Sequence, residues 1–395
     1  MLSNKALSIS PSPTLAIDSK FKEMKAQGID VVGFGAGEPD FDTPEHICAA
    51  AVEAIKCGKT RYTPAAGTME LRKLVCDKFK RENGLDYEPS QIVVSNGAKH
   101  SLVNAFMAIC NPGDEVIVPA PYWVSYPEMI KIADGVPVEL LTREEDDFKA
   151  TAAEYEAMMT DKTKAIVLNS PSNPTGMIYT KEELAAIAEV AVRHNVYVVS
   201  DEIYEHLIYE GVHTSIASLG DKIKDLTIVV NGVSKTYAMT GWRIGFTASN
   251  KEIAKVMSSI QSHATSNPNS IAQAAAAAAL TGGLDCVEKM KKEFVKRRDY
   301  MVEKINSLDG VSCIKPHGAF YIMMNVSALI GKTLYGKEIK SSDDFADLFL
   351  EKAKVAVVPG TGFAAPNYVR WSYATSMENC IEGLSRLEKF LKGEC

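Results

Sequence analysis

Short runs of apolar, β-favouring residues alternate with helical periods between residues 91 and 246. Between the third and fourth runs, the segment TKEELAAIAEVAVRHN carries a capping box at Thr180 and Glu183 ahead of one apolar helical face. Strands that alternate with helices in this way predict an α/β fold, a sheet with covering helices. The apolar runs are QIVVS (91–95), DEVIVPA (114–120), KAIVLN (164–169), VYVVSD (196–201) and LTIVVN (226–231).

A similar helix is predicted from Thr68 to Asn83, where Gly84 would end it. From about Asp285 the pattern changes to a long charged amphipathic helix, the short strands AFYIMMN and VAVVPG, and a last helix over 378–391. This predicts a second, α+β unit. The first forty-odd residues contain no complete domain, and we expect them to pack on that unit or on a neighbouring chain.

Composition narrows the class of partner. The 395 residues carry 43 Lys plus Arg and 50 Asp plus Glu, a net charge of -7 without long blocks. This balance argues against nucleic-acid or anionic-membrane surfaces and favours small-molecule partners. No segment has the length and apolarity of a signal peptide or membrane span, and the eight cysteines and seven histidines show no disulfide or metal-ligand spacing. We therefore expect a cytoplasmic protein with reduced thiols and no metal.

Polar residues follow the first three apolar runs, where ligands bind in open α/β sheets. After the first run, Gly97, Ala98 and Lys99 open a helix whose free N–H groups suit a phosphate. Trp123 follows the second run as a ring that can stack, and Asn173 follows the third run in the turn SPSNPTG. Taken singly, a backbone turn, a core tryptophan and an ordinary loop explain these residues equally well.

The last two runs add charged groups. Asp201 falls at a buried strand end, where a carboxylate is costly unless it meets a cation, and Tyr204 follows it. Lys235 and Arg243 follow the fifth run, and a lone lysine is most often a solvated surface residue. Together the five strand ends offer phosphate donors, a stacking ring, an amide, an acid and an amine. Pyridoxal phosphate needs this set of groups.

Five motifs carry a family resemblance over nearly the whole chain. On these motifs the chain resembles the class I and II aminotransferases, fold-type-I pyridoxal-phosphate enzymes, and most closely the bacterial aspartate aminotransferases. The resemblance implies a large cofactor-binding domain at residues 46–285, around a mostly parallel seven-stranded sheet. It implies a small domain from both chain ends, residues 1–45 and 286–395. The motifs are AGEPDFDTP, SPSNPTG, SDEIYE, GVSKTYAMTGWRIG and VRWSYATS.

The resemblance also assigns roles around the cofactor ring. It implies that Lys235 bonds covalently to the aldehyde of pyridoxal phosphate and that Asp201 pairs with the pyridinium nitrogen. It implies that Tyr204 and Asn173 contact the 3-oxygen of the ring and that Trp123 stacks on the ring. Lys235, Asp201 and Tyr204 are thus the expected catalytic residues.

At the phosphate, the resemblance implies contacts from Gly97, Ala98 and Arg243, with Ser234 assisting. Tyr62 would reach the phosphate of the neighbouring subunit. The expected active unit is therefore a homodimer whose active sites are shared across the interface.

The implied reaction moves the α-amino group of an L-amino acid to a 2-oxo acid by a ping-pong mechanism through pyridoxamine phosphate. Aspartate and 2-oxoglutarate are the expected pair. Arg370 would clamp the substrate α-carboxylate beside the Gly37 backbone, with Trp123 and Asn173 also at the substrate. Alone, Arg370 would be read as a solvated or structural arginine.

Recognition of the distal carboxylate needs a cation or polar cluster. Lys99 is a candidate, with Ser12 and Thr14, but phosphate contact is a competing role for Lys99. Some relatives of this branch accept prephenate and carry a basic residue where this chain has Ser10. We therefore do not expect that additional activity.

Other functions are open on the same fold. An aromatic, alanine or kynurenine transaminase and a β-elimination lyase are the nearest alternatives. A non-catalytic ligand-binding protein is another, but no DNA-binding module fits in this chain. The segment VVGFGAGEPD suggests a dinucleotide loop, yet its glycine spacing does not match and Pro39 and Pro44 follow where a helix should open. A nicotinamide dehydrogenase is not expected.

Overall fold

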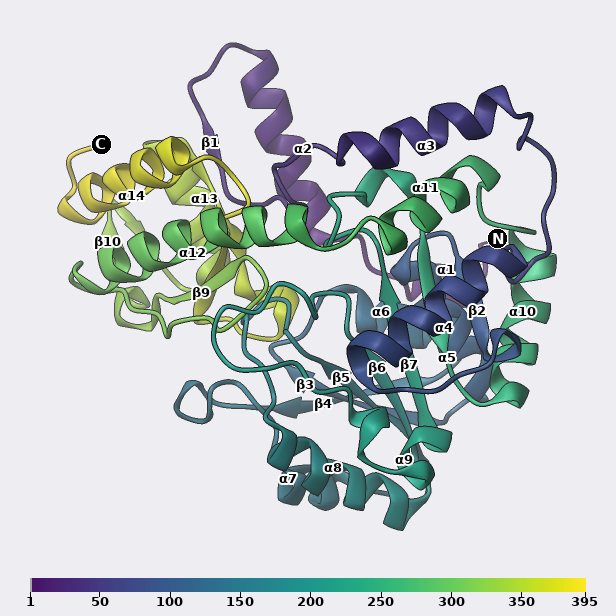
Figure 1. The fold of residues 1–395 in the computed structure, drawn as a ribbon. Helices are drawn as coiled ribbons and strands as arrows, with labels where there is room; N and C mark the ends of the chain where they lie inside the picture. The colour runs from purple at the N-terminus through teal and green to yellow at the C-terminus, as the bar shows by residue number, and fades with distance from the viewer. Residues whose placement is uncertain (1) are drawn as a thin grey trace.

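The computed structural model describes residues 2–395, and its centre is a seven-stranded sheet in the order β2-β8-β7-β6-β5-β3-β4 (Figure 1). Only β8 runs antiparallel to its neighbours, β2 and β7. The expected α/β fold with a mostly parallel seven-stranded sheet is confirmed. The strands are β2 Ile92–Ser95, β3 Glu115–Ala120, β4 Val136–Leu141, β5 Thr163–Asn169, β6 Tyr197–Asp201, β7 Thr227–Gly232 and β8 Gly245–Ala248.

Helices cover both faces of this sheet. They are α5 Ala98–Ile109, α6 Ser125–Ile132, α7 Ala152–Met158, α8 Lys181–His194, α9 Asp221–Leu226 and α10 Lys251–Ala264. Helices α5, α6 and α10 form a core with Val93 and Val199, whereas α7, α8 and α9 form a core with Ile166 and Val198 on the opposite face. Successive strand residues thus point to opposite apolar layers, which explains why these strands are continuous apolar runs in the sequence.

Two helices predicted from their caps are present. Helix α8 begins after the capping box, in which the Thr180 and Glu183 side chains each accept the other residue's backbone N–H. Helix α4, Met69–Asn83, begins after Thr68 and ends at Gly84, whose φ of 66° is left-handed. Strands β4 and β8 were not predicted, because β4 is a partly exposed edge strand and β8, with the sequence GFTA, has no run of β-branched apolar residues.

A second unit surrounds a three-stranded antiparallel sheet, β13-β14-β9. The predicted long helix and last helix correspond to α12 and α14. The VAVVPG run is divided between β12 and β13, which pair with different strands. The elements are α12 Asp285–Asn306, β9 Tyr321–Asn325, β10 Thr333–Leu334, β11 Lys337–Glu338, α13 Ser342–Ala353, β12 Val355–Ala356, β13 Val358–Pro359, β14 Tyr368–Ser372 and α14 Met377–Lys392.

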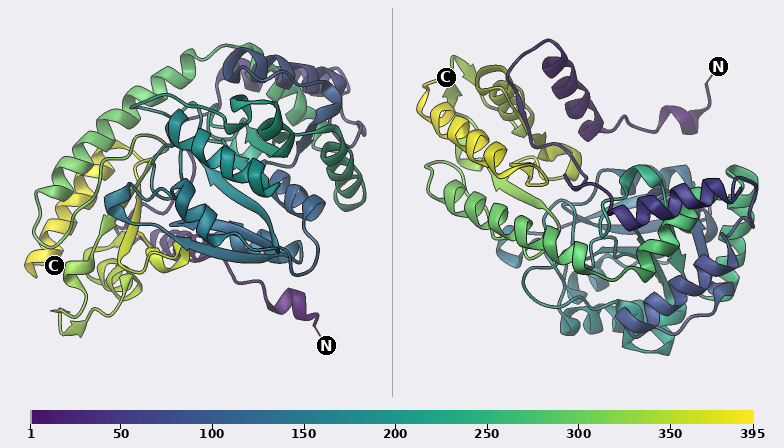
Figure 2. Two further views of the ribbon diagram at one scale, coloured as in Figure 1. Left: turned by 90° about the horizontal axis from the view of Figure 1, so that it is seen from below. Right: turned by 45° about the horizontal axis from the view of Figure 1, so that its top comes forward.

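The N-terminal segment contacts both parts of the molecule (Figure 2). Strand β1 pairs in parallel with β12, with Val32 opposite Val355, and α2 packs beside β12 and β13. Lys5 in α1 instead forms an ion pair with Asp134, just after α6. The segment comprises α1 Asn4–Leu7, α2 Pro13–Ala26, β1 Val32–Gly33 and α3 Glu45–Lys56.

Helices α11 and α12 connect the two units. Helix α11, Ser270–Thr281, packs on α3 and α4, whereas α12 contacts α14 and β9. Across residues 2–395, no single helix is both long enough and apolar enough to cross a bilayer; by length and composition alone, the bent pair α11 and α12 passes the same criterion.

Candidate active site

A cavity of about 490 Å³ lies at the carboxyl edge of the central sheet, against the second unit. Eleven of the sequence-predicted cofactor and substrate residues line it, as does Thr14, a candidate for the distal carboxylate. Gly97 adjoins it through its contact with Arg243. Tyr62 does not reach it, because its side chain is 90% exposed elsewhere on this chain. The eleven are Gly37, Ala98, Lys99, Trp123, Asn173, Asp201, Tyr204, Ser234, Lys235, Arg243 and Arg370.

Lys235 presents an amine to this cavity from the segment after β7. Burial lowers the pKa of Lys235 to about 8, although the negative charges of Glu38 and Asp201 act in the opposite direction. Its Nζ donates to the Gly37 carbonyl at 2.5 Å. An amine whose pKa lies this near neutrality has a larger unprotonated fraction than an ordinary lysine, as a nucleophile for a carbonyl requires.

Asp201 is a buried acid at the end of β6, 3% exposed. Tyr126 donates to Oδ2 at 2.7 Å and the Ile203 backbone N–H to Oδ1 at 3.2 Å. Burial raises the pKa of Asp201 to about 6, against the lowering effect of these two hydrogen bonds. Both donors are neutral, so they do not balance the negative charge of the carboxylate. A protonated ring nitrogen of a ligand would supply the positive charge that a buried carboxylate needs.

The start of α5 and Arg243 form an anion site. Gly97 precedes the helix with φ of 87°, and a Cβ there would overlap the Arg243 guanidinium. Arg243 donates to the Thr240 carbonyl at 2.8 Å and to the Asn96 carbonyl at 3.3 Å. No ion pair therefore neutralises the charge of Arg243 within residues 2–395. This positive charge lies beside the free N–H groups at the start of α5, a 12-residue helix. This combination fits a phosphate group.

Arg370 is a buried cation in β14, 2% exposed. Its Nη1 donates to Asn173 Oδ1 at 2.9 Å and its Nη2 to the Gly35 carbonyl at 3.0 Å. Its Nε is buried and has no partner in the part of the chain that the structure describes. Burial lowers the pKa of Arg370. A guanidinium that is desolvated without a counter-ion, at the wall of a cavity, fits a ligand carboxylate.

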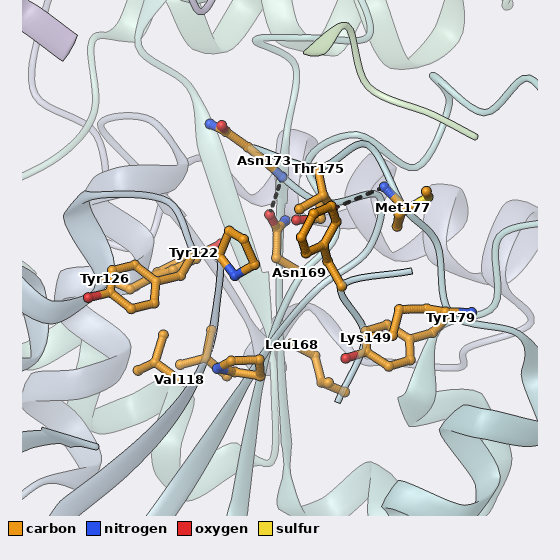
Figure 3. Close-up of a pocket in the computed structure, with 15 residues that line it drawn as sticks. Val118, Tyr122, Tyr126, Lys149, Leu168, Asn169, Asn173, Thr175, Met177 and Tyr179 are labelled. Atoms are coloured by element: carbon orange, nitrogen blue, oxygen red, sulfur yellow. Dashed lines mark hydrogen bonds between the residues drawn. The ribbon is translucent and has the colours of Figure 1, made fainter. Parts of the chain in front are cut away.

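A smaller cavity of about 30 Å³ lies behind Asn173 (Figure 3). On its wall, Asn169 Oδ1 accepts the backbone N–H of Asn173 at 2.8 Å, and Asn169 Nδ2 donates to the Asp201 carbonyl at 3.0 Å. Asn169 therefore fixes the SPSNPTG turn to the strand that carries Asp201. Tyr126 lines both cavities.

Lys99 and Trp123 lie together at another wall of the main cavity. The Lys99 ammonium is 4.8 Å from the centroid of the Trp123 ring. Burial lowers the pKa of Lys99, and the charge of Arg243 lowers it further. Lys99 is thus a cation that a carboxylate or a phosphate would stabilise.

The lining residues that sequence reasoning missed include Glu38, Tyr126, Thr240 and Tyr321. The sequence contained a signal for Tyr126. It lies three residues after Trp123, on the first turn of α6, and the carboxylate of a buried Asp201 needs a hydrogen-bond donor. Tyr321 gave no such signal. Its place depends on the pairing of β9 with β14, strands that are far apart in the sequence.

Comparisons with known proteins agree with this geometry. The family model "Aminotransferase class I and II" matches residues 29–387. The chain is 49% identical over 393 residues to "Aspartate aminotransferase" of Bacillus sp. (strain YM-2), covering 99% of each chain, and 48% identical to that of Bacillus subtilis (strain 168), also covering 99% of each.

Two solved structures share the fold closely. The Rhizobium meliloti aspartate aminotransferase is 44% identical with a TM-score of 0.96, and the Thermus thermophilus enzyme with maleate is 46% identical with a TM-score of 0.94; each match covers 99% of both chains. The fold and cavity define a pyridoxal-phosphate-dependent enzyme of fold type I. The chain belongs to the class I and II aminotransferases.

The burial of Asp201 yields a prediction with opposite effects on stability and cofactor binding. In the cofactor-free protein at pH 8, Asp201→Asn should raise the free energy of unfolding by roughly 1–3 kcal/mol, because it removes a buried charge. The gain should be full above pH 6, the folded-state pKa of Asp201, and should shrink as the pH falls. It should vanish only below pH 3.8, the ordinary pKa of the carboxyl, where the group is protonated in both states. Cofactor affinity should fall.

Urea unfolding at fixed protein concentration and a cofactor titration measure the two effects. The exposed Asp161→Asn is the matched control and should change neither. An Asp201→Asn variant that is less stable at pH 8 and binds the cofactor normally would contradict the assignment.

Proposed function

We propose that this protein transfers the α-amino group of L-aspartate to 2-oxoglutarate in a ping-pong reaction. The observation that carries the proposal is one cavity faced by an amine of lowered pKa, Lys235, and by an uncompensated buried guanidinium, Arg370. An amino acid bound through its carboxylate at Arg370 would present its amine and α-carbon inside that cavity. The names of the relatives support aspartate as the donor.

When bound, pyridoxal phosphate supplies an electron sink for the α-carbon. Lys235 would hold the group through its aldehyde, and its Nζ, when free, would accept the α-proton of the substrate and return it. Asp201 would keep the ring nitrogen protonated through its buried negative charge. Tyr204 and Asn173 would hold the 3-oxygen, and Trp123 would stack on the ring.

Orientation of the substrate comes from groups fixed by other contacts. Arg370 binds the α-carboxylate with the Gly37 backbone beside it, and its hydrogen bond to Asn173 keeps the guanidinium plane in place. A substrate carboxylate fixed in this way would hold the α-carbon in one orientation, so that positioning would contribute to the rate. At the other end, Gly97, Ala98, Ser234 and Arg243 hold the phosphate.

We propose Lys99 as the group that binds the distal carboxylate of aspartate, with Thr14 and Ser12. Lys99 and Thr14 line the same cavity, and the Ser12 and Thr14 hydroxyls lie 2.8 Å apart. The competing role for Lys99, phosphate contact, is less favourable because Arg243 already places a positive charge beside the N-terminus of α5 and repels a second one. The distal carboxylate of a substrate would instead pair with the buried ammonium of Lys99 and stabilise it.

The active unit is proposed to be a homodimer. Tyr62 is a large, almost fully exposed side chain on a segment outside its own cavity, and Val52, Ile55 and Met69 nearby in the chain are exposed apolar residues. A second copy that covers these residues would bring Tyr62 to the phosphate corner of its partner.

The domain division is a further proposal: residues 46–285 form one domain, and residues 1–45 with 286–395 form the other. The residues that line the cavity support this division. Asp201 and Lys235 belong to the part of the chain that forms the large sheet, whereas Gly37 and Arg370 belong to the two chain ends. Succinate, a dicarboxylate without an amine, should then slow backbone hydrogen exchange in residues 32–40 and 368–372 as well as around Asp201. Slowing confined to one unit would contradict the division.

A substrate panel tests the function. Aspartate, phenylalanine, alanine and cysteine are added separately to the purified holoenzyme, and the loss of the absorbance of bound pyridoxal phosphate is followed. Aspartate should be the fastest, with oxaloacetate as product and no ammonia. Lys235→Ala should show neither the absorbance nor turnover. Pyruvate and ammonia from cysteine, or faster conversion of phenylalanine or alanine, would replace the proposal with one of those activities.

Two substitutions separate the carboxylate sites. Lys99→Met should lower kcat/KM for aspartate about 10- to 100-fold and leave alanine and phenylalanine nearly unchanged, because a charge-assisted hydrogen bond contributes roughly 1.5–3 kcal/mol. Arg370→Lys should lower kcat/KM for all three, since every donor has an α-carboxylate and lysine lacks the planar fork. If Lys99 served the phosphate instead, Lys99→Met would weaken cofactor binding and affect all donors alike.

Subunit mixing tests the shared site. Lys235→Ala and Tyr62→Ala dimers, each of low activity, are dissociated and reassociated together. If Tyr62 acts in the partner, each mixed dimer has one intact site, and random mixing should restore about one quarter of wild-type activity. If Tyr62 acts in its own subunit, no intact site forms and activity stays low.

A further inference from the structure

Tyr321 is a fully buried tyrosine beneath the main cavity, at the start of β9. None of the family motifs contains it, and no role has been given to it above. It touches both Arg370, at the carboxylate site, and Tyr204, the tyrosine expected at the cofactor ring.

The ring of Tyr321 supports Arg370. The guanidinium carbon lies 4.4 Å from the centroid of the Tyr321 ring, and the Phe363 ring lies 5.1 Å away. Strand pairing fixes this contact, because Tyr321 is opposite Ser372 in the antiparallel pair of β9 and β14, two residues beyond Arg370. Aromatic faces stabilise a desolvated guanidinium and restrict its orientation.

The hydroxyl of Tyr321 contacts Tyr204. The two Oη atoms lie 2.9 Å apart. Gly37 closes the other side, because a Cβ on Gly37 would lie 3.3 Å from Tyr321 Oη. The Tyr321 hydroxyl therefore has little room to rotate away from Tyr204.

Proton counting sets the direction of this hydrogen bond. A phenol has one proton, so Tyr204 can donate to the 3-oxygen of the cofactor only if it accepts, rather than donates, at Tyr321. Tyr321 must then be the donor, and the order is Tyr321 to Tyr204 to the ring oxygen. Hydrogen bonds in such a chain polarise and strengthen one another.

The charge of Arg370 reaches both phenols. Burial raises the pKa of Tyr204 and of Tyr321, and the Arg370 guanidinium opposes both rises. A carboxylate that binds Arg370 neutralises this positive charge, so both phenols then hold their protons more firmly. The charged groups that face the pair are Arg370, Asp201, Glu38 and Lys235, whose Nζ lies 6.0 Å from the centroid of the Tyr204 ring.

We propose that Tyr321 is a positioning residue that couples the carboxylate site to the cofactor ring: its ring orients Arg370, and its hydroxyl orients the Tyr204 proton towards the 3-oxygen. This coupling rests on the proposed function in one respect, the placement of Tyr204 at that oxygen. Tyr321 would thus affect the hydrogen bond at the cofactor ring as well as the binding of the substrate.

The test compares wild type, Tyr321→Phe and the control Tyr373→Phe as holoenzymes. Tyr373 is also fully buried, with its hydroxyl 3.4 Å from the Ala319 carbonyl, and does not line the cavity. Bound-cofactor absorbance is titrated against pH, with and without saturating succinate. Melting temperatures record any loss of packing.

Tyr321→Phe should raise the pH midpoint of the absorbance change by about 0.5 unit, because a weaker donor at the 3-oxygen leaves the bound group more basic. Succinate should raise the midpoint in the wild type by removing the charge of Arg370, and should raise it less in Tyr321→Phe. Tyr373→Phe should behave as wild type in both titrations, even if its melting temperature falls.

Kinetics separates the two roles of the side chain. Tyr321→Phe keeps the ring, so kcat for aspartate should fall about 3- to 10-fold with KM nearly unchanged. Tyr321→Leu removes ring and hydroxyl, so KM should rise as well, by roughly 3- to 30-fold.

Equal succinate-induced shifts in wild type and Tyr321→Phe would overturn the proposal, as would a wild-type midpoint that succinate does not move. Failure of the proposed function looks different: the wild type would not convert aspartate, while the succinate titrations would still decide the coupling.

Discussion

The structure depends on two buried charges, the carboxylate of Asp201 and the guanidinium of Arg370, and neither has an ion-pair partner among residues 2–395. Each is costly to bury alone, and each lies at the wall of one cavity. Asp201 accepts hydrogen bonds from neutral donors and Arg370 donates to neutral acceptors, and these bonds lower the cost of burial without cancelling either charge. A ligand that brings a cationic ring nitrogen and a carboxylate recovers this energy on binding, and the enzyme can use it for orientation.

The large sheet makes this arrangement possible. Its parallel strands end at one edge, so residues that follow β2, β3, β5, β6 and β7 converge although they span more than a hundred positions in sequence. The antiparallel strand β8 returns the chain past the start of α5 and places Arg243 there. The opposite wall comes from β14 and the segment after β1, which allows a substrate carboxylate to be held from outside the sheet.

Much of this could be predicted from the sequence because it depends on local patterns. Apolar runs predicted five strands of the sheet, and helix caps predicted α4 and α8. Asp201 and Lys235 were predicted because they lie at the end of a strand and after a strand, respectively. What depends on pairing between distant segments could not be predicted. Tyr321 acquires its place only from the register of β9 with β14, and the edge strand β4 lacks a continuous apolar run because one side of it is exposed.

The parallel pair of β1 and β12 joins residues 32–33 to residues 355–356. During translation, the strands of the large sheet emerge and can pair while β12 has not yet been made. The N-terminal segment therefore has no partner for its strand until nearly the whole chain has left the ribosome. Closure of this contact is a late, long-range step in folding, and the Gly35 carbonyl reaches its place beside Arg370 only then.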